Sequence, residues 1–341
     1  MSRGLIWTTV IVMLGWGVWA GLRGTAAPPA TIDEVRGNDL DMYAAVTEQV
    51  AGGRGYYQVL ATELTRRGYA IRPLFNWRMP TLTWINVGLK YSWMRRGVLI
   101  GLGVAVIFLW LAAIWQRIPN TIVWAFFLLI GAFVPLFFIR KIVFFYEIWS
   151  GWLLAGSLAM WGLGRWRASV ALGAAALAIR ELALPYVVVM AVIAWRESRR
   201  REWIAWVSVA VVFVLLWALH ILRVLQVIPP AGLTNSWVVA GGWAFVLAAS
   251  HTSIWMLLTK EPWAAVFLVP FAWAGAWHWR DALGRRIALV LSVYFAFFMV
   301  AGRPDNWYWG FMITPLLPLG PLGFFFRPRK VTANAVPVAR T

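Results

Sequence analysis

The chain has 341 residues, of which 62% are hydrophobic and 13% charged, and its formal net charge is +18. This composition excludes a water-soluble globule, and the apolar runs are continuous rather than alternating, so the sequence predicts an all-α polytopic membrane protein and not a barrel. The chain has no cysteine and three scattered histidines, which excludes disulfides and thiolate chemistry and disfavours a zinc site, and its basic residues flank apolar runs, so we expect no nucleic-acid partner.

Residues 5–22 form the first predicted span, with the N-terminus in the cytoplasm. The loop 23–96 then lies outside. It holds six of the chain's 13 acidic residues, namely Asp33, Glu34, Asp39, Asp41, Glu48 and Glu63.

Two short helices are expected within this loop. Asn38 can cap a helix over 39–51 that lies on the membrane and stops at Gly52 and Gly53. A second helix over 58–67 ends at Gly68, and an irregular segment, 73–80, leads toward the next span.

Residues 168–194 form an apolar stretch with basic clusters on both sides, so the positive-inside rule puts both of its ends in the cytoplasm. Its 27 residues are too few for two full crossings, which need roughly 40. We therefore expect a half-depth re-entrant hairpin whose tip carries Arg180 and Glu181 toward a cavity. The alternative is one tilted span with a buried Arg180–Glu181 ion pair.

Charge counting places the stretch 233–258 along the outer interface. The expected bundle has eight full spans and forms one domain, 1–330, followed by a disordered cytoplasmic tail, 331–341. After the first span, the other seven cover 98–115, 122–139, 142–163, 203–222, 263–277, 287–301 and 308–326.

With this topology, ionisable residues of both signs converge on the outer face. Such residues beside the hydrocarbon region are costly and mark function. Cations on the side where they are normally disfavoured suggest an anionic ligand, such as a lipid-linked phosphate. The candidates are Asp39, Asp41, Arg140, Lys141, Glu147, Arg180, Glu181, His251, Arg303, Asp305 and Tyr308.

Three segments carry a family resemblance. They are Asp39-Leu-Asp-Met-Tyr43 with the following Ala51-Gly-Gly-Arg-Gly-Tyr56-Tyr57 and Arg78-Met79-Pro80, the basic hairpin between Arg165 and Arg201, and Gly302-Arg-Pro-Asp-Asn-Trp-Tyr308 with Pro315 downstream. Together they resemble the GT-C superfamily of integral-membrane glycosyltransferases. The chain departs from that pattern because 73–80 lacks adjacent prolines and because 341 residues are few for this class, so we expect no soluble C-terminal acceptor-binding domain.

The resemblance implies a GT-C-like helical bundle that moves a sugar, with inversion, from a polyprenyl-phosphate donor to a glycan, glycolipid or protein hydroxyl. The reaction would take place on the extracytoplasmic face of a bacterial-type plasma membrane, and we expect a monomer. Asp39 matches the catalytic Asp by position, and a carboxylate can take the proton of an attacking hydroxyl. The donor phosphate would bind Arg140, Lys141, Arg180, Arg303 and Tyr308. Secondary catalytic or acceptor-binding roles fall to Asp41, Tyr43, Glu147, Glu181 and His251.

Other interpretations stay open at this stage. Acids in a first helical turn also complement the helix dipole without any catalytic role. Asp39 and Asp41 could hold a divalent ion, but two oxygens are weak evidence, so no metal or other cofactor is predicted. A transporter or flippase of polyprenyl-phosphate lipid, or a scaffold subunit of an envelope complex, would need no base. A flippase should show internal repeats, and none is visible.

Overall fold

The computed structural model describes residues 1–23, 32–115, 141–230, 232–234, 236, 239–251 and 263–325, and gives the backbone alone of residues 32–38 and 304. Within these ranges the chain is helical, with one isolated β-bridge between Arg72 and Thr234. Four described helices are long and apolar enough to cross a membrane, which fits an all-α membrane protein. They are α1 (Arg3–Leu22), α5 (Ser92–Ile114), α10 (Arg200–Leu225) and α14 (Ala282–Ala301).

The remaining helices are shorter. The expected span 122–139 and the tail 331–341 lie outside the described residues. The shorter α-helices are α2 (Ile32–Ala51), α3 (Tyr56–Arg66), α4 (Thr81–Gly88), α7 (Tyr146–Gly162), α8 (Trp166–Ile179), α9 (Leu184–Arg196), α11 (Gly242–His251) and α13 (Trp263–His278), and the 3-10 segments are η1 (Leu74–Asn76), η3 (Ile142–Phe144), η4 (Glu181–Ala183), η5 (Pro304–Met312), η6 (Leu317–Leu319) and η7 (Pro321–Phe324).

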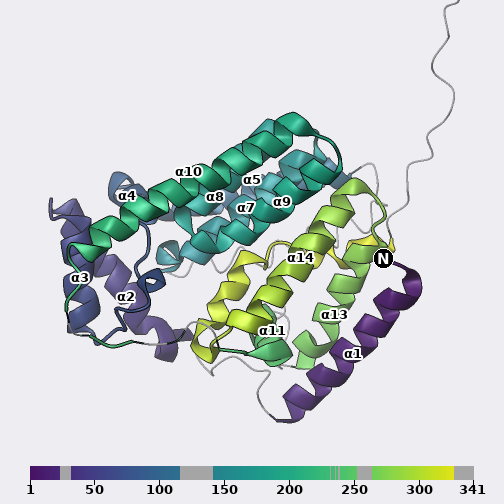
Figure 1. Cartoon of the computed structure of the whole chain (residues 1–341), viewed down its shortest axis with the longest axis horizontal. Helices are drawn as coiled ribbons and strands as arrows, with labels where there is room; N and C mark the ends of the chain where they lie inside the picture. Colours follow the sequence, from purple (N-terminus) through teal and green to yellow (C-terminus); the bar gives the residue numbers. More distant parts are fainter. Residues whose placement is uncertain are drawn as a thin grey trace, which may run out of the picture.

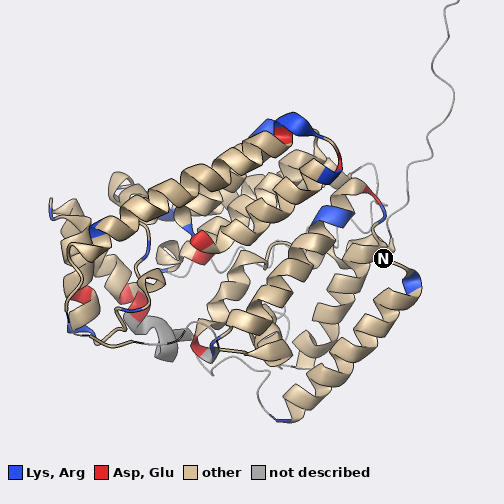
Figure 2. Ribbon diagram, in the orientation of Figure 1, with Lys and Arg blue, Asp and Glu red and all other residues tan. Residues whose placement is uncertain are grey.

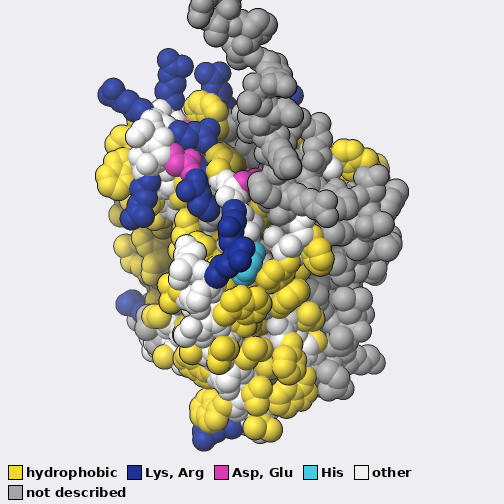
Figure 3. All heavy atoms as spheres, turned by 90° about the vertical axis from the view of Figure 1, so that its right-hand side faces the viewer, with side chains coloured by type: hydrophobic (Ala, Val, Ile, Leu, Met, Phe, Trp, Pro, Cys, Tyr) yellow, Lys and Arg dark blue, Asp and Glu magenta, His cyan; other side chains and the backbone are white. Residues whose placement is uncertain are grey.

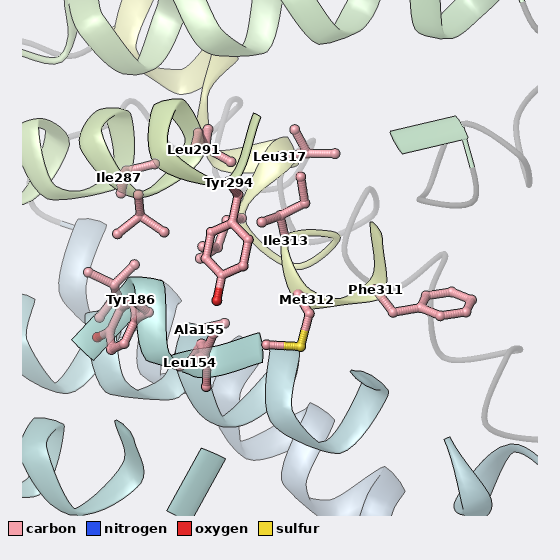
Figure 4. Packing of buried hydrophobic residues seen from close by; sticks show 14 of the residues in the cluster. Leu154, Ala155, Tyr186, Ile287, Leu291, Tyr294, Phe311, Met312, Ile313 and Leu317 are labelled. Carbon is pink, nitrogen blue, oxygen red and sulfur yellow. The ribbon is translucent and has the colours of Figure 1, made fainter. Parts of the chain in front are cut away.

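The helices form two groups that meet along a buried seam (Figure 1). One group contains α5 and α7 to α10, and the other contains α1, α11, α13 and α14. At the seam α14 packs on α7 and α9, and Tyr294 of α14 projects between Tyr186 of α9 and the segment with Met312 and Ile313 (Figure 4). Helices α2, α3 and α4 cover one end of the first group.

The stretch between the two basic clusters folds as two short antiparallel helices, α8 and α9. The chain breaks at Arg180, whose backbone is extended between Ile179 and η4. The loop that follows α9 returns to the end of α7, where the Arg199 guanidinium lies 5.1 Å from the Trp161 ring centroid and Glu202 accepts a 2.9 Å bond from Trp161 Nε1. The start of α8 and the end of α9 therefore lie at the same end of the bundle.

Neighbouring side chains bind the backbone on both sides of this break. The Tyr294 hydroxyl of α14 donates to the Leu182 carbonyl at 2.8 Å, and Ser150 Oγ of α7 donates at 3.0 Å to the Ala176 carbonyl, which also accepts the Arg180 amide at 2.9 Å. A helix break inside a bundle is stable only when its backbone polar groups find such partners. Close packing adds to this, since a Cβ at Gly173 would stand 2.6 Å from the Trp206 ring.

The expected turns of the outer loop are present. α2 ends at Ala51, and Gly53 adopts a φ of 90°. α3 ends in the same way, with Gly68 at a φ of 71° and the Tyr69 amide bonded to the Leu64 carbonyl at 2.9 Å. These are Schellman ends, in which glycine takes the left-handed position. The expected start of the first helix was wrong, because α2 begins at Ile32 and Asn38 lies inside it rather than capping it.

The expected last span, 308–326, is not an α-helix. The segment is buried, but it runs as the 3-10 segments η5, η6 and η7 joined by turns. Pro315, Pro318 and Pro321 recur every three residues, and each lacks the amide proton that an α-helix needs. The repeat therefore favours short i→i+3 turns.

The interfacial position expected for 233–258 was also wrong in its central part. Residues 242–251 form α11, which packs against α1, α13, α14 and η5. Its buried side chains include Trp243, Phe245, Leu247, Ser250 and His251. A helix that is apolar on every side fits a core position better than a surface one.

Candidate functional site

The outer loop packs against the C-terminal part of α10, where a histidine binds it. His220 Nε2 lies 3.0 Å from the Trp77 carbonyl, and His220 Nδ1 lies 3.1 Å from the Tyr57 hydroxyl. Because a carbonyl only accepts, Nε2 carries the proton and Nδ1 accepts from Tyr57. A small apolar cluster around Met42, Val46 and Trp77 holds α2 and α3 on this platform.

Directly after Trp77, Arg78 enters a buried chain of alternating charges. Arg78 Nη1 lies 3.2 Å from Glu181 Oε1, Glu181 pairs in turn with Arg180, and Arg180 Nε lies 2.8 Å from Glu147 Oε1. All four side chains are at most 12% exposed. Two guanidinium groups balance two carboxylates, which makes the burial of this cluster tolerable.

The cluster joins three segments that are distant in sequence. Arg78 precedes α4, Glu147 lies in the first turn of α7, and Arg180 and Glu181 form the tip between α8 and α9. The tip of the helix pair thus lies at the same end of the bundle as the outer loop, opposite to the basic turns (Figure 2).

Tyrosines surround the Arg78 side of the cluster. The Tyr56 hydroxyl donates to the Arg78 carbonyl at 2.7 Å, and the Tyr43 and Tyr146 ring centroids are 5.2 Å apart. The Tyr308 hydroxyl donates to Asn306 Oδ1 at 3.2 Å. Burial alone would lower the pKa of Arg78, but the neighbouring Tyr43 and Glu181 hold it above its usual range.

Asp39 is half-buried and lies one helical turn before Tyr43, on the same face of α2. Burial raises the pKa of the Tyr43 hydroxyl, and the charges of Arg78 and Asp39 then act in opposite directions on it. Burial also raises the pKa of the Tyr69 hydroxyl, and the nearby Asp39 charge raises it further. Asp39 is therefore close to both Tyr43 and Tyr69.

The other sequence candidates are arranged as surface ion pairs. Lys141 Nζ pairs with Asp41, and both side chains are more than 40% exposed. Arg303 Nε and Nη2 bind the two Asp305 oxygens at 3.0 and 2.8 Å. Arg140 lies outside the described residues.

His251 was expected on the outer surface, but it is buried at the end of α11, a helix that packs against η5. In the part of the chain that the structure describes, no group of three or more His, Asp or Glu side chains is placed to hold a metal ion.

An apolar groove includes in its lining the residue that follows Arg78. It has a volume of about 340 Å³, lies between α8 and α10, and reaches Met79, the residue next to Arg78. Its walls are aliphatic apart from Phe213 and the exposed Ser208; the lining residues are Met79, Ala174, Leu177, Ala178, Ser208, Val209, Val212, Phe213 and Leu216.

Comparison of the chain with protein families, curated proteins and solved structures finds no match.

Sequence reasoning missed Arg78 and Tyr69 as site residues. Arg78 was noticed only as part of a motif, because nothing in Trp77-Arg78-Met79-Pro80 indicates that its side chain turns inward to meet Glu181. Tyr69 follows the helix-ending Gly68, and that Schellman turn is the one local signal that its direction is fixed.

Proposed function

We propose that this protein is an inverting glycosyltransferase of the GT-C type, which moves a sugar from a polyprenyl-phosphate donor to an acceptor hydroxyl on the extracytoplasmic side of a bacterial-type plasma membrane. One observation carries the proposal. The apolar groove between α8 and α10 is lined in part by Met79, which directly follows the buried Arg78 in the chain, and both Arg78 and Asp39 lie close enough to Tyr43 for their charges to act on it. An apolar groove together with a cation and a carboxylate fits a lipid phosphate ester of a sugar.

The distribution of charge supports this orientation. Basic residues gather in the turns that follow α9 and precede α10 and α14, at the end of the bundle that lies away from α2 (Figure 2). The positive-inside rule assigns that end to the cytoplasm, so Asp39 faces the other side. The pair α8 and α9 is then a re-entrant hairpin whose 14- and 13-residue arms reach about 20 Å, less than the roughly 30 Å of a hydrocarbon core.

We assign the donor phosphate to Arg78 rather than to the cations expected from sequence. Lys141 and Arg303 are engaged with Asp41 and Asp305, and the Arg180 side chain is fully buried behind Glu147 and Glu181. The described hydrogen bonds of Arg78 come from Nη1, so we assign its Nε and Nη2 donors to phosphate oxygens. Arg180, Glu147 and Glu181 act as positioning residues that hold Arg78 in place.

In the proposed reaction the acceptor oxygen attacks the anomeric carbon while the bond from that carbon to the phosphate oxygen breaks. The Asp39 carboxylate takes the proton of the acceptor hydroxyl, which makes the oxygen a better nucleophile. Polyprenyl phosphate leaves with the bonding electrons, and Arg78 stabilises the charge that develops on it. Attack from the side opposite to the leaving group gives inversion.

The test is transfer of radiolabelled sugar by the purified protein in liposomes, with polyprenyl-phosphate-linked hexoses and pentoses as donors and a membrane glycan extract as acceptor. We expect transfer from at least one donor, and an increase in the donor KM of at least about tenfold for Arg78→Gln, since the substitution removes a charged hydrogen bond of roughly 1.5–3 kcal/mol. Arg303→Gln, which removes a surface-paired arginine near the same end, is the matched control and should keep the wild-type KM. Movement of the donor lipid across the bilayer without any transfer would favour the flippase and overturn the proposal.

A further inference from the structure

A second cavity lies at the opposite, basic end of the molecule. It has a volume of about 400 Å³ and is formed by the start of α1, the end of α13 and the turn into α14. Arg3, Arg280 and Arg285 line it together with His278, and none of the described residues that line it carries a carboxylate. Figure 3 looks onto this end and shows Lys and Arg side chains gathered over it.

The acidic groups near this cavity are already engaged. Both Glu197 oxygens bind the buried Arg286, at 2.6 and 3.1 Å, whereas Arg285 makes a single 3.3 Å contact with Glu197 and is 60% exposed. Asp281 caps α14 by accepting a 2.8 Å bond from the Gly284 amide. The three arginines of the cavity thus keep an excess of positive charge, which favours an anionic occupant.

The surface beside the cavity is apolar and aromatic. The Phe324 ring packs between two other rings, with centroid distances of 4.9 Å to His278 and 4.7 Å to Phe271. The centroid of the Trp7 ring lies 6.3 Å from that of Phe324. Trp7 and Phe271 are 45% and 43% exposed. A ligand with an anionic head and apolar chains would contact both the arginine-lined cavity and this aromatic surface. A free phosphate would contact only the cavity.

We propose that this cavity binds the phosphate headgroup of an anionic phospholipid of the cytoplasmic leaflet, with its acyl chains lying along α1 and α13. Arg3, Arg280 and Arg285 contact the phosphate oxygens, and Trp7 and Phe271 contact the chains. Basic pockets between membrane helices on the cytoplasmic side recognise lipid headgroups by the same chemistry. This site lies at the other end of the bundle from Asp39 and needs no sugar transfer.

The experiment is native mass spectrometry of the purified full-length protein titrated with phosphatidylglycerol, cardiolipin or phosphatidylcholine. We expect retention of the two anionic lipids but not of phosphatidylcholine. The triple variant Arg3→Gln, Arg280→Gln, Arg285→Gln should lower that retention at least tenfold. The control triple variant Arg165→Gln, Arg196→Gln, Arg201→Gln removes the same charge from exposed positions near the same end and should retain lipid as the wild type does.

Equal loss in the two triple variants would overturn the proposal, because the lipid would then respond to general surface charge. Complete displacement of the lipid by millimolar inorganic phosphate would also overturn it, by showing a site for a free anion. If the pocket triple variant does not fold, the single change Arg280→Glu at an exposed position is measured instead, and unchanged retention there contradicts the proposal. None of these measurements of lipid retention depends on glycosyl transfer, so their outcome is independent of the proposed reaction.

Discussion

Arg180 Nε lies 2.8 Å from Glu147 Oε1, and neither side chain is more than 4% exposed. This ion pair joins the tip of the α8–α9 pair to the first turn of α7, and through Glu181 it also reaches Arg78. Removing one partner leaves a buried charge without compensation, which costs about 3–5 kcal/mol. The pair therefore couples the geometry of the hairpin tip to the position of Arg78.

Glu147→Gln and Arg180→Met should each destabilise the protein by about that amount, whereas the double variant should lose less than the sum of the two. The measurement is denaturant unfolding in detergent micelles. Asp305→Asn, which breaks an exposed ion pair, is the control and should change stability by less than about 1 kcal/mol. Small and additive effects of Glu147→Gln and Arg180→Met would show that the pair is not coupled.

Ser198 has a φ of 56° at the turn between α9 and α10, where the Arg199 amide bonds to the Ala194 carbonyl at 2.9 Å. A non-glycine residue in this left-handed position costs about 1–2 kcal/mol. Ser198→Gly should therefore stabilise the protein by up to about 1 kcal/mol, seen as a higher thermal unfolding midpoint. Ser208→Gly, inside α10, should instead destabilise it by about 0.5–1 kcal/mol. A lower midpoint for Ser198→Gly would contradict this interpretation.

Glu63 links α3 to α2 by accepting a 2.9 Å hydrogen bond from Gln49 Nε2. Burial alone would raise the pKa of Glu63, but bonds from Arg66, Arg67 and Gln49 lower it below its ordinary value of 4.5. A carboxylate with a depressed folded-state pKa contributes stability that is fully present above pH 4.5 and is lost as the pH falls through its folded pKa.

Glu63→Gln should thus destabilise the protein at neutral pH and make its unfolding less dependent on pH below 4.5. Thermal unfolding followed from pH 7 downward checks both effects, with Glu48→Gln on the exposed side of α2 as the control. A Glu63→Gln profile parallel to that of the wild type would exclude this role for Glu63.

Local signals predicted the parts of the fold that depend on local chemistry. Gly53 and Gly68 end their helices because they can take a positive φ, and the polar pair Arg180-Glu181 indicated the break between α8 and α9. The burial of α11 was not predictable in this way, because an evenly apolar segment has the same sequence pattern whether it lies in the protein core or at the membrane interface. The proline repeat from Pro315 to Pro321 did carry a signal against an α-helical span, and it was outweighed by hydrophobicity.

The candidate site was predicted only in part. Glu147, Arg180 and Glu181 were expected near one another, and the structure brings them into contact. Arg78 joins them through tertiary packing, since the docking of Trp77 on His220 turns the chain inward, and no local pattern encodes that contact. The pairing of Arg303 with Asp305 was not predicted, because the sequence interpretation assigned Arg303 to the donor phosphate.

The most direct test of the central claim compares the transfer rates of Asp39→Asn and Asp41→Asn in the radiolabelled-sugar assay. The two substitutions remove the same charge two residues apart on α2, but Asp39 lies beside Tyr43 and Tyr69 whereas Asp41 pairs with Lys141 at the surface. Loss of a general base reduces the rate by about 10²–10⁴-fold, so Asp39→Asn should fall by at least a hundredfold while Asp41→Asn stays within about tenfold of the wild type. Wild-type transfer by Asp39→Asn would contradict the assignment of Asp39 as the base.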